Sequence, residues 1–348
     1  MKIALVAPIE EKVPPYKYGG TEVVIFNLVE ELIKQGHDVT LLASGDSITS
    51  AKLIACSETA VRQQLEDNPR GWYLSQIEGL RIAAEAVKAE KFDIVHNHCD
   101  WPFLILSGLF KDQPVVTTIH NPTLYSKQVQ KAYGNQHFIS ISNSQRRQIP
   151  FLKTVTTIYN GIDVDAFEYN AKPQQYLSFL GRICPDKGPK QAIEIAKRSG
   201  HRLIIAAKID VLDQKYYRDV IKPLIDGEQI TFIGEIGHDQ KVNLLKNAKA
   251  LLSPIQWEEP FGLTNIEAMA CGTPVIAQNR GSMPEIIVSG KTGYLCKSVD
   301  EMIERLEDIP KLKRLDCRLH IQNNFSAHLM ANEYIKAYKK IINGYPKT

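Results

Sequence analysis

A pair of glycines near the N-terminus could bind a phosphate group. Gly19, Gly20 and Thr21 follow the first apolar run and come where we expect a helix to begin. Glycine lets backbone N–H groups approach an anion closely, and the N-terminus of a helix favours negative charge. A plain turn is the alternative, because the segment lacks the GxGxxG spacing of dinucleotide sites. Bound phosphate would require the carboxylate of Glu22 to point elsewhere.

Two basic residues later in the chain suit the same ligand. Arg182 and Lys187 lie in a predicted strand-to-helix loop. The planar guanidinium can hold two phosphate oxygens and the ammonium adds a point charge, so both could reach one diphosphate. Gly262, Leu263 and Thr264, at the expected start of another helix, would add backbone N–H groups. Solvated surface charge is the alternative for the two cations.

Two carboxylates could bind the hydroxyl groups of a sugar. Glu259 precedes the helix that we expect to begin near residue 261 or 262, and Glu267 lies one to two turns inside it. Each carboxylate can accept hydrogen bonds from sugar hydroxyls. Alternatively, Glu259 only complements the helix dipole and Glu267 lies at the surface.

Histidines gather after two predicted strands of the first half. His96 and His98 follow one strand, and His120 follows another. Because ligands bind at the carboxyl ends of parallel strands, we expect His120 to hydrogen-bond a polar substrate. The spacing of His96 and His98 could chelate a metal, but no third ligand is evident, so we expect no metal site.

The composition is that of an ordinary globular chain. Its 348 residues suggest two domains, and 42 basic minus 39 acidic residues give +3, which speaks against a dedicated nucleic-acid binder. No apolar run approaches the ~20 residues of a membrane helix, and the N-terminus lacks the features of a signal peptide. The six cysteines form no CxxC pair. We therefore expect a cytoplasmic protein. An anionic acceptor or the inner face of a membrane is the alternative suggested by Lys127, Lys131, Arg146, Arg147 and Lys153.

Short apolar runs alternate with helical patterns along the whole chain. In the first half the runs are Ile3–Ala7, Val39–Ala43, Asp93–His96, Val115–Ile119, Phe138–Ile141 and Val155–Tyr159. In the second half they are Tyr176–Leu180, Leu203–Ala207, Ile230–Ile233, Ala250–Pro254 and Pro274–Ala277. Such strands, separated by helices like that expected over Thr21–Gln35, indicate a parallel sheet covered on both faces. We interpret the polar stretch Gly161–Gln175 as the interdomain linker.

These patterns predict an α/β fold of two doubly wound, Rossmann-like domains, residues 1–165 and 166–324. Open sheets of this kind bind ligands at the carboxyl ends of their strands, so we expect a cleft there between the domains. The C-terminal stretch 325–348 is expected to be helical, with apolar residues near one stripe. We expect this helix to pack back on the N-terminal domain.

Seven segments resemble, in the same order, the retaining glycosyltransferases of family four, which have the GT-B fold. They are YGGTE, DIVHNH, TTIH, IYNGID, FLGRICPDKG, EEPFGLTNIEAMACGTPVIA and GSMPEIIVSGKTGYL. The resemblance spans nearly the whole chain, and the sixth segment is highly specific. It implies transfer of a hexose from a nucleotide-diphosphate sugar, with UDP preferred, to an acceptor that could be a saccharide, a lipid or a small molecule. It also implies no cofactor and no bound metal.

The resemblance assigns roles to the residues above. Residues 1–165 would form the acceptor side and residues 166–324 would bind the nucleotide sugar. The donor diphosphate would be bound by Gly19, Gly20, Thr21, Arg182, Lys187, Gly262, Leu263 and Thr264. Glu267 would hold the ribose hydroxyls, and Glu259 and His120 would contact the donor sugar as catalytic residues. Cations and helix N-termini would stabilise the diphosphate as it leaves, and retention without a clear nucleophile implies front-side attack.

Two other functions remain open at this stage. A nucleotide-sugar epimerase can use the same two-domain architecture, and a binding protein could hold a nucleotide sugar without turning it over. An NAD-dependent oxidoreductase ranks lowest, because neither half carries GxGxxG with a downstream acidic residue for the ribose.

Overall fold

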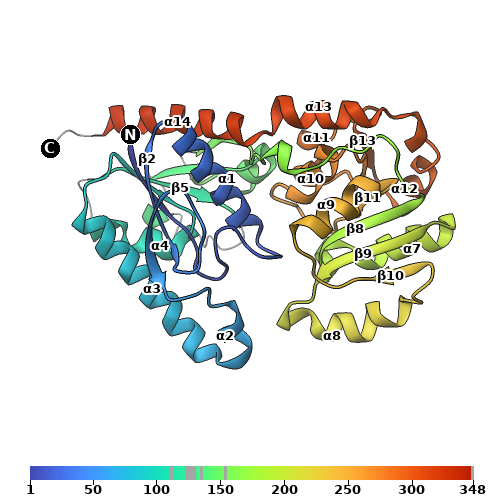
Figure 1. Cartoon of the computed structure of the whole chain (residues 1–348), viewed down its shortest axis with the longest axis horizontal. Helices are drawn as coiled ribbons and strands as arrows, with labels where there is room; N and C mark the ends of the chain where they lie inside the picture. Colours follow the sequence, from blue (N-terminus) through green and yellow to red (C-terminus); the bar gives the residue numbers. More distant parts are fainter. Residues whose placement is uncertain (110–112, 122–130, 134–135, 153–154, 346–348) are drawn as a thin grey trace. The chain divides into compact units, whose positions relative to one another are not determined.

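The chain folds into two compact α/β units (Figure 1). The computed structural model describes residues 1–109, 113–121, 131–133, 136–152 and 155–345, so Lys127 and Lys153 lie outside the described residues. Unit 1 consists of Met1–Gly161 together with Ala327–Thr348, and unit 2 is Ile162–Ser326. The polypeptide thus passes between the units at 161/162 and again at 326/327, where we had expected 165/166 and 324/325.

Unit 1 is built on a seven-stranded parallel sheet with the order β3-β2-β1-β4-β5-β6-β7. Its strands are β1 (Lys2–Val6), β2 (Asp38–Ser44), β3 (Lys52–Ser57), β4 (Ile94–Asn97), β5 (Val115–Ile119), β6 (His137–Ser140) and β7 (Val155–Thr157). Its described α-helices are α1 (Gly20–Lys34), α2 (Arg62–Asp67), α3 (Pro69–Ala89), α4 (Asp100–Leu106), α6 (Asn143–Gln148) and α14 (Ala327–Gly344). The strand order reverses between β1 and β4, the place where open sheets bind ligands.

Unit 2 is built on a six-stranded parallel sheet with the order β10-β9-β8-β11-β12-β13. Its strands are β8 (Tyr176–Arg182), β9 (Arg202–Lys208), β10 (Ile230–Phe232), β11 (Ala250–Ser253), β12 (Val275–Gln278) and β13 (Gly293–Cys296). Its helices are α7 (Pro189–Ser199), α8 (Gln214–Tyr216), α9 (His238–Asn247), α10 (Leu263–Ala270), α11 (Met283–Ile286), α12 (Val299–Arg305) and α13 (Arg314–Asn324). Here the strand order reverses between β8 and β11.

The predicted strands are all present, with ends shifted by at most two residues, and the doubly wound α/β class is confirmed. The prediction missed β3 and β13, which both lie at a sheet edge. Edge strands contact the core on fewer sides, so their sequences need less apolar character. In β3 most side chains are partly or fully exposed, and only Cys56 is buried.

The C-terminal helix α14 belongs to the core of unit 1. Tyr334 and Tyr338 are fully buried, and the buried positions of α14 recur every three or four residues. The helix packs beside α1, as Figure 1 shows. A stretch that is distant in sequence from the sheet of unit 1 therefore supplies two of its largest buried side chains.

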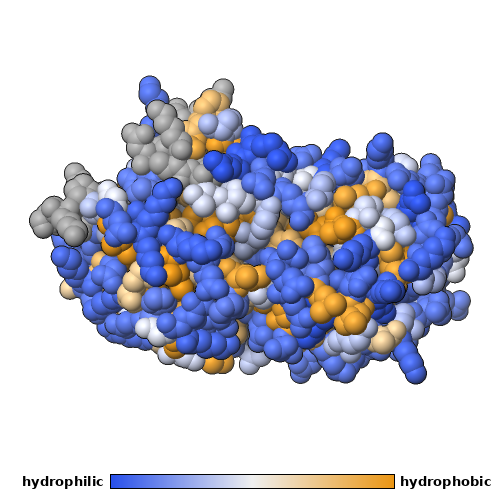
Figure 2. Space-filling model, turned by 90° about the horizontal axis from the view of Figure 1, so that it is seen from above, coloured by the Kyte–Doolittle hydropathy of each residue, from blue (hydrophilic) through white to orange (hydrophobic). Residues whose placement is uncertain are grey.

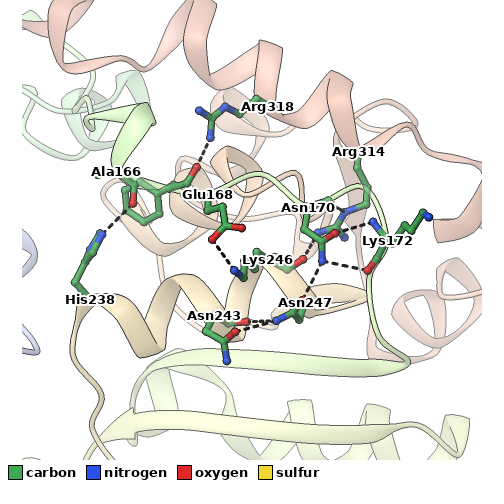
Figure 3. Close-up of polar contacts among 11 residues, drawn as sticks. Ala166, Glu168, Asn170, Lys172, His238, Asn243, Lys246, Asn247, Arg314 and Arg318 are labelled. Atoms are coloured by element: carbon green, nitrogen blue, oxygen red, sulfur yellow. Dashed lines mark hydrogen bonds and ion pairs between the residues drawn. The ribbon is translucent and has the colours of Figure 1, made fainter.

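Most of the polar stretch 161–175 is packed on unit 2, so its interpretation as a linker is wrong beyond Gly161 and Ile162. Figure 3 shows its contacts with α9 and α13. Ala166 O accepts from Nε2 of His238 at 3.0 Å, and Glu168 Oε2 lies 2.6 Å from Nζ of Lys246. Nδ2 of Asn170 donates to Oδ1 of Asn247 at 2.9 Å. The backbone oxygen of Asn170 accepts from Nε of Arg314 at 2.6 Å. Backbone and side-chain polar groups of this irregular segment are thus bonded to α9 and α13 of unit 2.

The two passages between the units run side by side. Ile162 N donates to Phe325 O at 3.0 Å, and Ile162 forms a parallel bridge with Ser326.

In the part of the chain that the structure describes, every helix is too short or too polar to traverse a lipid bilayer. On the face that Figure 2 shows, hydrophobic residues lie scattered among hydrophilic ones.

Candidate functional site

The loops that follow β8 and β11 are locked together in unit 2. Gly188 has φ +74°, and a Cβ atom there would lie 2.0 Å from Pro254 O, so only glycine fits. Gln256 N donates to Asp186 O at 2.7 Å across the same contact. These contacts hold the β8 loop, with its short turn η4 (Pro185–Lys187), against the segment that carries Trp257 and Glu259.

Lys187 and Glu259 meet at this contact. Nζ of Lys187 lies 2.5 Å from Oε2 of Glu259, and Nε1 of Trp257 donates to the same oxygen at 2.8 Å. The ammonium also lies 5.2 Å from the centre of the Trp257 ring. Glu259 is 7% exposed, so its carboxylate is buried beside the start of α10. The pair thus places a cation next to a carboxylate that is able to accept hydrogen bonds from sugar hydroxyls.

Helix α10 begins directly after this carboxylate. Gly262 caps it with φ +85°, and Leu263 and Thr264 form its first turn, as predicted. Ser282 fixes the approach to the helix, because its hydroxyl donates to Phe261 O at 2.7 Å. The N–H groups of a first helical turn have no intrahelical acceptor, so this turn suits an anion.

Arg182 ends β8 and forms an ion pair that the sequence did not suggest. Its Nε lies 3.1 Å from Oδ2 of Asp213, at the end of the turn η5 (Val211–Asp213). Burial raises the pKa of the Asp213 carboxyl, and the guanidinium of Arg182 opposes this shift. In the register of β8 and β9, Arg182 stands opposite Lys208, which is 9% exposed. Lys208 is thus a further buried cation at this edge of the sheet.

Glu267 is buried within α10 and pairs with a residue from the neighbouring helix. Its carboxylate contacts the ammonium of Lys241 in α9, and only 3% of its side chain is exposed. Its interpretation as a surface residue is therefore wrong. Sequence reasoning missed Lys241, because nothing in the spacing of α9 distinguishes it from other helical lysines.

The predicted donor-binding cations are thus charge-compensated within unit 2. Arg182 pairs with Asp213, and Lys187 pairs with Glu259, while Lys241 neutralises Glu267. An arriving dianion could attract the ammonium of Lys187 away from Glu259. The released carboxylate would then be able to accept hydrogen bonds from another part of the same ligand.

In unit 1, the glycine pair follows β1 and opens α1. Gly19 has φ +154°, and a Cβ atom there would lie 2.8 Å from the side chain of Pro15 and 2.9 Å from Oε2 of Glu22. The Glu22 carboxyl therefore lies against Gly19 and does not point away from this loop. Burial raises the pKa of Glu22 to about 7, so this carboxyl is largely protonated below neutral pH and then repels an anion less.

His120 follows β5 and contacts His98, which follows β4. Its Nε2 lies 2.9 Å from Nδ1 of His98, and its backbone N–H donates to Oδ1 of Asp100 at 3.2 Å. Asp100 has φ +51°, a strained conformation for a residue with a side chain. Burial lowers the pKa of His120 to about 4, so the imidazole is neutral at pH 7. A neutral ring can hydrogen-bond a sugar hydroxyl through one nitrogen while the other is held by His98.

The three histidines use their ring nitrogens to contact one another and nearby hydroxyls. Within the described ranges, no group of three or more His, Cys, Asp or Glu side chains is arranged to hold a metal ion.

Comparison with protein families matches both halves of the chain. Residues 18–166 match the family described as Glycosyltransferase Family 4, and residues 163–324 match Glycosyl transferases group 1. The chain belongs to these glycosyltransferases. The second match contains Arg182, Lys187, Glu259 and Glu267, and the first contains the glycine pair and His120.

Individual relatives and structures agree with this family. The glycosyltransferase is 28% identical to the glycogen synthase of Mycobacterium tuberculosis, over 82% of this chain and 81% of that protein. Its fold resembles that of sucrose-phosphate synthase from Thermosynechococcus elongatus, with a TM-score of 0.78 and 20% identity over 98% and 99% of the two chains. It also resembles Anabaena HepE in complex with UDP and glucose, with a TM-score of 0.74 and 16% identity over 98% and 100%. These similarities confirm the GT-B fold.

Proposed function

We propose that this glycosyltransferase moves a hexose from a UDP-sugar to a saccharide, lipid or small-molecule acceptor, with retention of the anomeric configuration and without a bound metal. The observation that carries this proposal is the contact of Lys187 with the buried carboxylate of Glu259, beside the first turn of α10. This contact places an ammonium that suits the leaving diphosphate beside a carboxylate that can accept hydrogen bonds from the sugar.

The chemistry follows from how charge moves during transfer. As the bond between the anomeric carbon and the phosphate oxygen breaks, negative charge grows on the diphosphate and positive charge grows on the sugar. Arg182, Lys187 and the N–H groups of α10 would stabilise the former. Glu259, released from Lys187, would orient the sugar through its hydroxyls, and Glu267 would hold the ribose. Protein cations would thereby supply the charge that a metal supplies in other transferases.

Unit 1 contributes His120 and the glycine pair in this proposal. His120 would form one hydrogen bond with a hydroxyl of the donor sugar, as donor or as acceptor, because its ring is neutral at pH 7. Backbone N–H groups at Gly20 and Thr21 would meet the diphosphate. The choice of UDP is supported by HepE, whose structure holds UDP and glucose. Retention is supported by the family resemblance of the sequence motifs.

Ligand-induced stabilisation tests the donor. UDP and UDP-sugars should raise the melting temperature more than GDP, ADP or their sugars, because a ligand that binds only the folded state stabilises it. By calorimetry, Arg182→Ala and Lys187→Met should each weaken UDP binding about tenfold or more, an effect of about 1.4 kcal/mol. Lys190→Met, an exposed lysine of α7, is the matched control. Unchanged binding in both site variants would show that the diphosphate assignment is wrong.

Product analysis tests the reaction. With donor and an acceptor panel, NMR should show an α-linked product from an α-linked donor, at a rate that EDTA does not lower. Conversion of the donor's sugar configuration without acceptor would instead identify an epimerase.

A further inference from the structure

A buried hydrogen-bond chain in unit 1 connects the C-terminal helix to His120. The hydroxyl of Tyr338, in α14, lies 2.6 Å from Nδ1 of His96. Nε2 of His98 lies 3.2 Å from the same nitrogen, and Nδ1 of His98 lies 2.9 Å from Nε2 of His120. His96, His98 and Tyr338 are at most 1% exposed, so water cannot replace these partners.

The far side of His96 extends the chain to a second tyrosine. Its Nε2 lies 2.7 Å from Oγ1 of Thr118, which lies 2.9 Å from the hydroxyl of Tyr334. Burial lowers the pKa of all three histidines and raises the pKa of both tyrosines. The rings are thus neutral imidazoles with one N–H each, and the phenols keep their protons.

Only two directions of donation are consistent with one N–H on each ring. If Nδ1 of His96 accepts, the Tyr338 hydroxyl and Nε2–H of His98 share its single lone pair in a three-centre hydrogen bond. His98 then accepts from Nε2–H of His120. Nδ1 of His120 is then an acceptor. If Nδ1 of His96 carries the proton instead, every bond reverses and Nδ1 of His120 becomes a donor.

The 2.6 Å contact of Tyr338 favours the first direction. This length lies within the range for an O–H donor and is shorter than the usual range for an N–H donor. In this direction Tyr338 donates to His96, and His96 carries its own proton on Nε2 and donates it to Thr118. Among the described residues, the carboxyl of Asp100 also contacts His120, through the backbone N–H of the histidine.

We propose that Tyr338 is a positioning residue that acts through His96 and His98 to hold His120 in the Nε2–H tautomer, leaving Nδ1 as a hydrogen-bond acceptor. This inference rests on the proposed function for its consequence: Nδ1 of His120 would accept a hydrogen bond from a sugar hydroxyl. His120 would thus favour donor sugars whose group nearest to Nδ1 is a free hydroxyl. It would disfavour sugars that place only a hydrogen-bond acceptor next to this nitrogen.

Imidazole NMR tests the tautomer without any substrate. In a long-range proton–nitrogen correlation spectrum of the ¹⁵N-labelled wild type, His120 should show a protonated Nε2 and an unprotonated Nδ1. Its signals are assigned by their loss in His120→Asn. In Tyr338→Phe we expect the His120 pattern to move towards the opposite tautomer or a mixture. Tyr334→Phe is the matched control, because it removes a buried hydroxyl from the same helix but leaves the donor to His96 in place.

Two NMR results would overturn the proposal. One is a wild-type His120 that carries its proton on Nδ1, a measurement that does not depend on any variant folding. The other is a Tyr338→Phe spectrum in which the His120 signals are unchanged.

Kinetics separates this inference from the proposed function. Tyr338→Phe should lower kcat about tenfold with little change in the donor KM, whereas Tyr334→Phe should change kcat by less than threefold. If the tautomer is as expected but His120→Asn transfers sugar at the wild-type rate, the assigned role of His120 is wrong while the positioning by Tyr338 stands.

Discussion

Nζ of Lys187 lies 2.5 Å from Oε2 of Glu259, where the loops after β8 and β11 meet. Only 9% of the Glu259 side chain is exposed, so water does little to solvate its negative charge. The ammonium of Lys187 and the indole N–H of Trp257 compensate this charge instead. The contact is both a structural link and the centre of the proposed donor site, and its two roles can be measured separately.

Lys187→Met should lower the free energy of unfolding by about 2 kcal/mol, because a buried carboxylate that loses its partner is costly. The double variant Lys187→Met, Glu259→Gln should recover most of this loss, since no charge is then left uncompensated. Urea denaturation measures both, with Lys190→Met as control. A double variant whose loss equals the sum of the single losses would mean that the two side chains do not interact.

Glu259→Gln and Glu267→Gln should affect different kinetic constants. At saturating donor, Glu259→Gln should lower kcat about 100-fold, because it acts where charge develops in the transition state. Glu267→Gln should mainly raise the donor KM, since a ribose contact is made equally in the ground and transition states. The control is Glu258→Gln, whose side chain is 57% exposed. Equal effects of the two site variants on kcat and KM would contradict these separate roles.

Gly188→Ala should be far more destabilising than Gly200→Ala. Both glycines have a left-handed backbone, with φ of +74° and +69°, so each substitution costs about 1–2 kcal/mol of strain. At Gly188 the new Cβ would also lie 2.0 Å from Pro254 O, whereas at Gly200 nothing lies within 4 Å. Thermal unfolding should show the difference, and UDP affinity should fall in Gly188→Ala alone. Similar melting temperatures for both variants would disprove the close contact with Pro254.

Glu22→Gln should remove part of the pH dependence of stability. The pKa of Glu22 rises from 4.5 to about 7 on folding because burial disfavours its charge. The folded state therefore binds this proton more tightly, and stability falls as pH rises from 4.5 to 7. Relative to the wild type, Glu22→Gln should gain stability across this window, by up to about 3 kcal/mol at pH 8. Denaturant titrations at pH 4.5, 6 and 8 measure this, and a constant difference between the two proteins would refute it.

The sequence allowed the central parts of both sheets to be predicted, because buried parallel strands are nearly continuous apolar runs. It missed one edge strand of each sheet, β3 and β13, although the opposite edge strands β7 and β10 were predicted. It also identified the site residues of unit 2 as candidates, but not their partners. Asp213 and Lys241 reach Arg182 and Glu267 only through the crossing of separate loops and helices, and no local periodicity encodes such a pairing.

The chain of hydrogen bonds behind His120 shows the same limit. The sequence placed His96 and His98 after one predicted strand and His120 after another, and the structure brings the three rings into contact. Tyr338 lies 242 residues from His96. The apolar stripe on the last helix indicated that one face of this helix would pack on unit 1, but not that the hydroxyl of Tyr338 would meet a histidine.

Because α14 completes unit 1, the order of synthesis on the ribosome matters for this protein. Unit 2 is one uninterrupted stretch. Unit 1, by contrast, needs α14, which is translated after unit 2, to supply the buried side chains of Tyr334 and Tyr338. The half that is translated first can therefore reach its native packing only after the last helix has left the exit tunnel. Until then the apolar residues that α14 covers stay exposed, so a nascent chain or one that ends before α14 would be a natural client for chaperones.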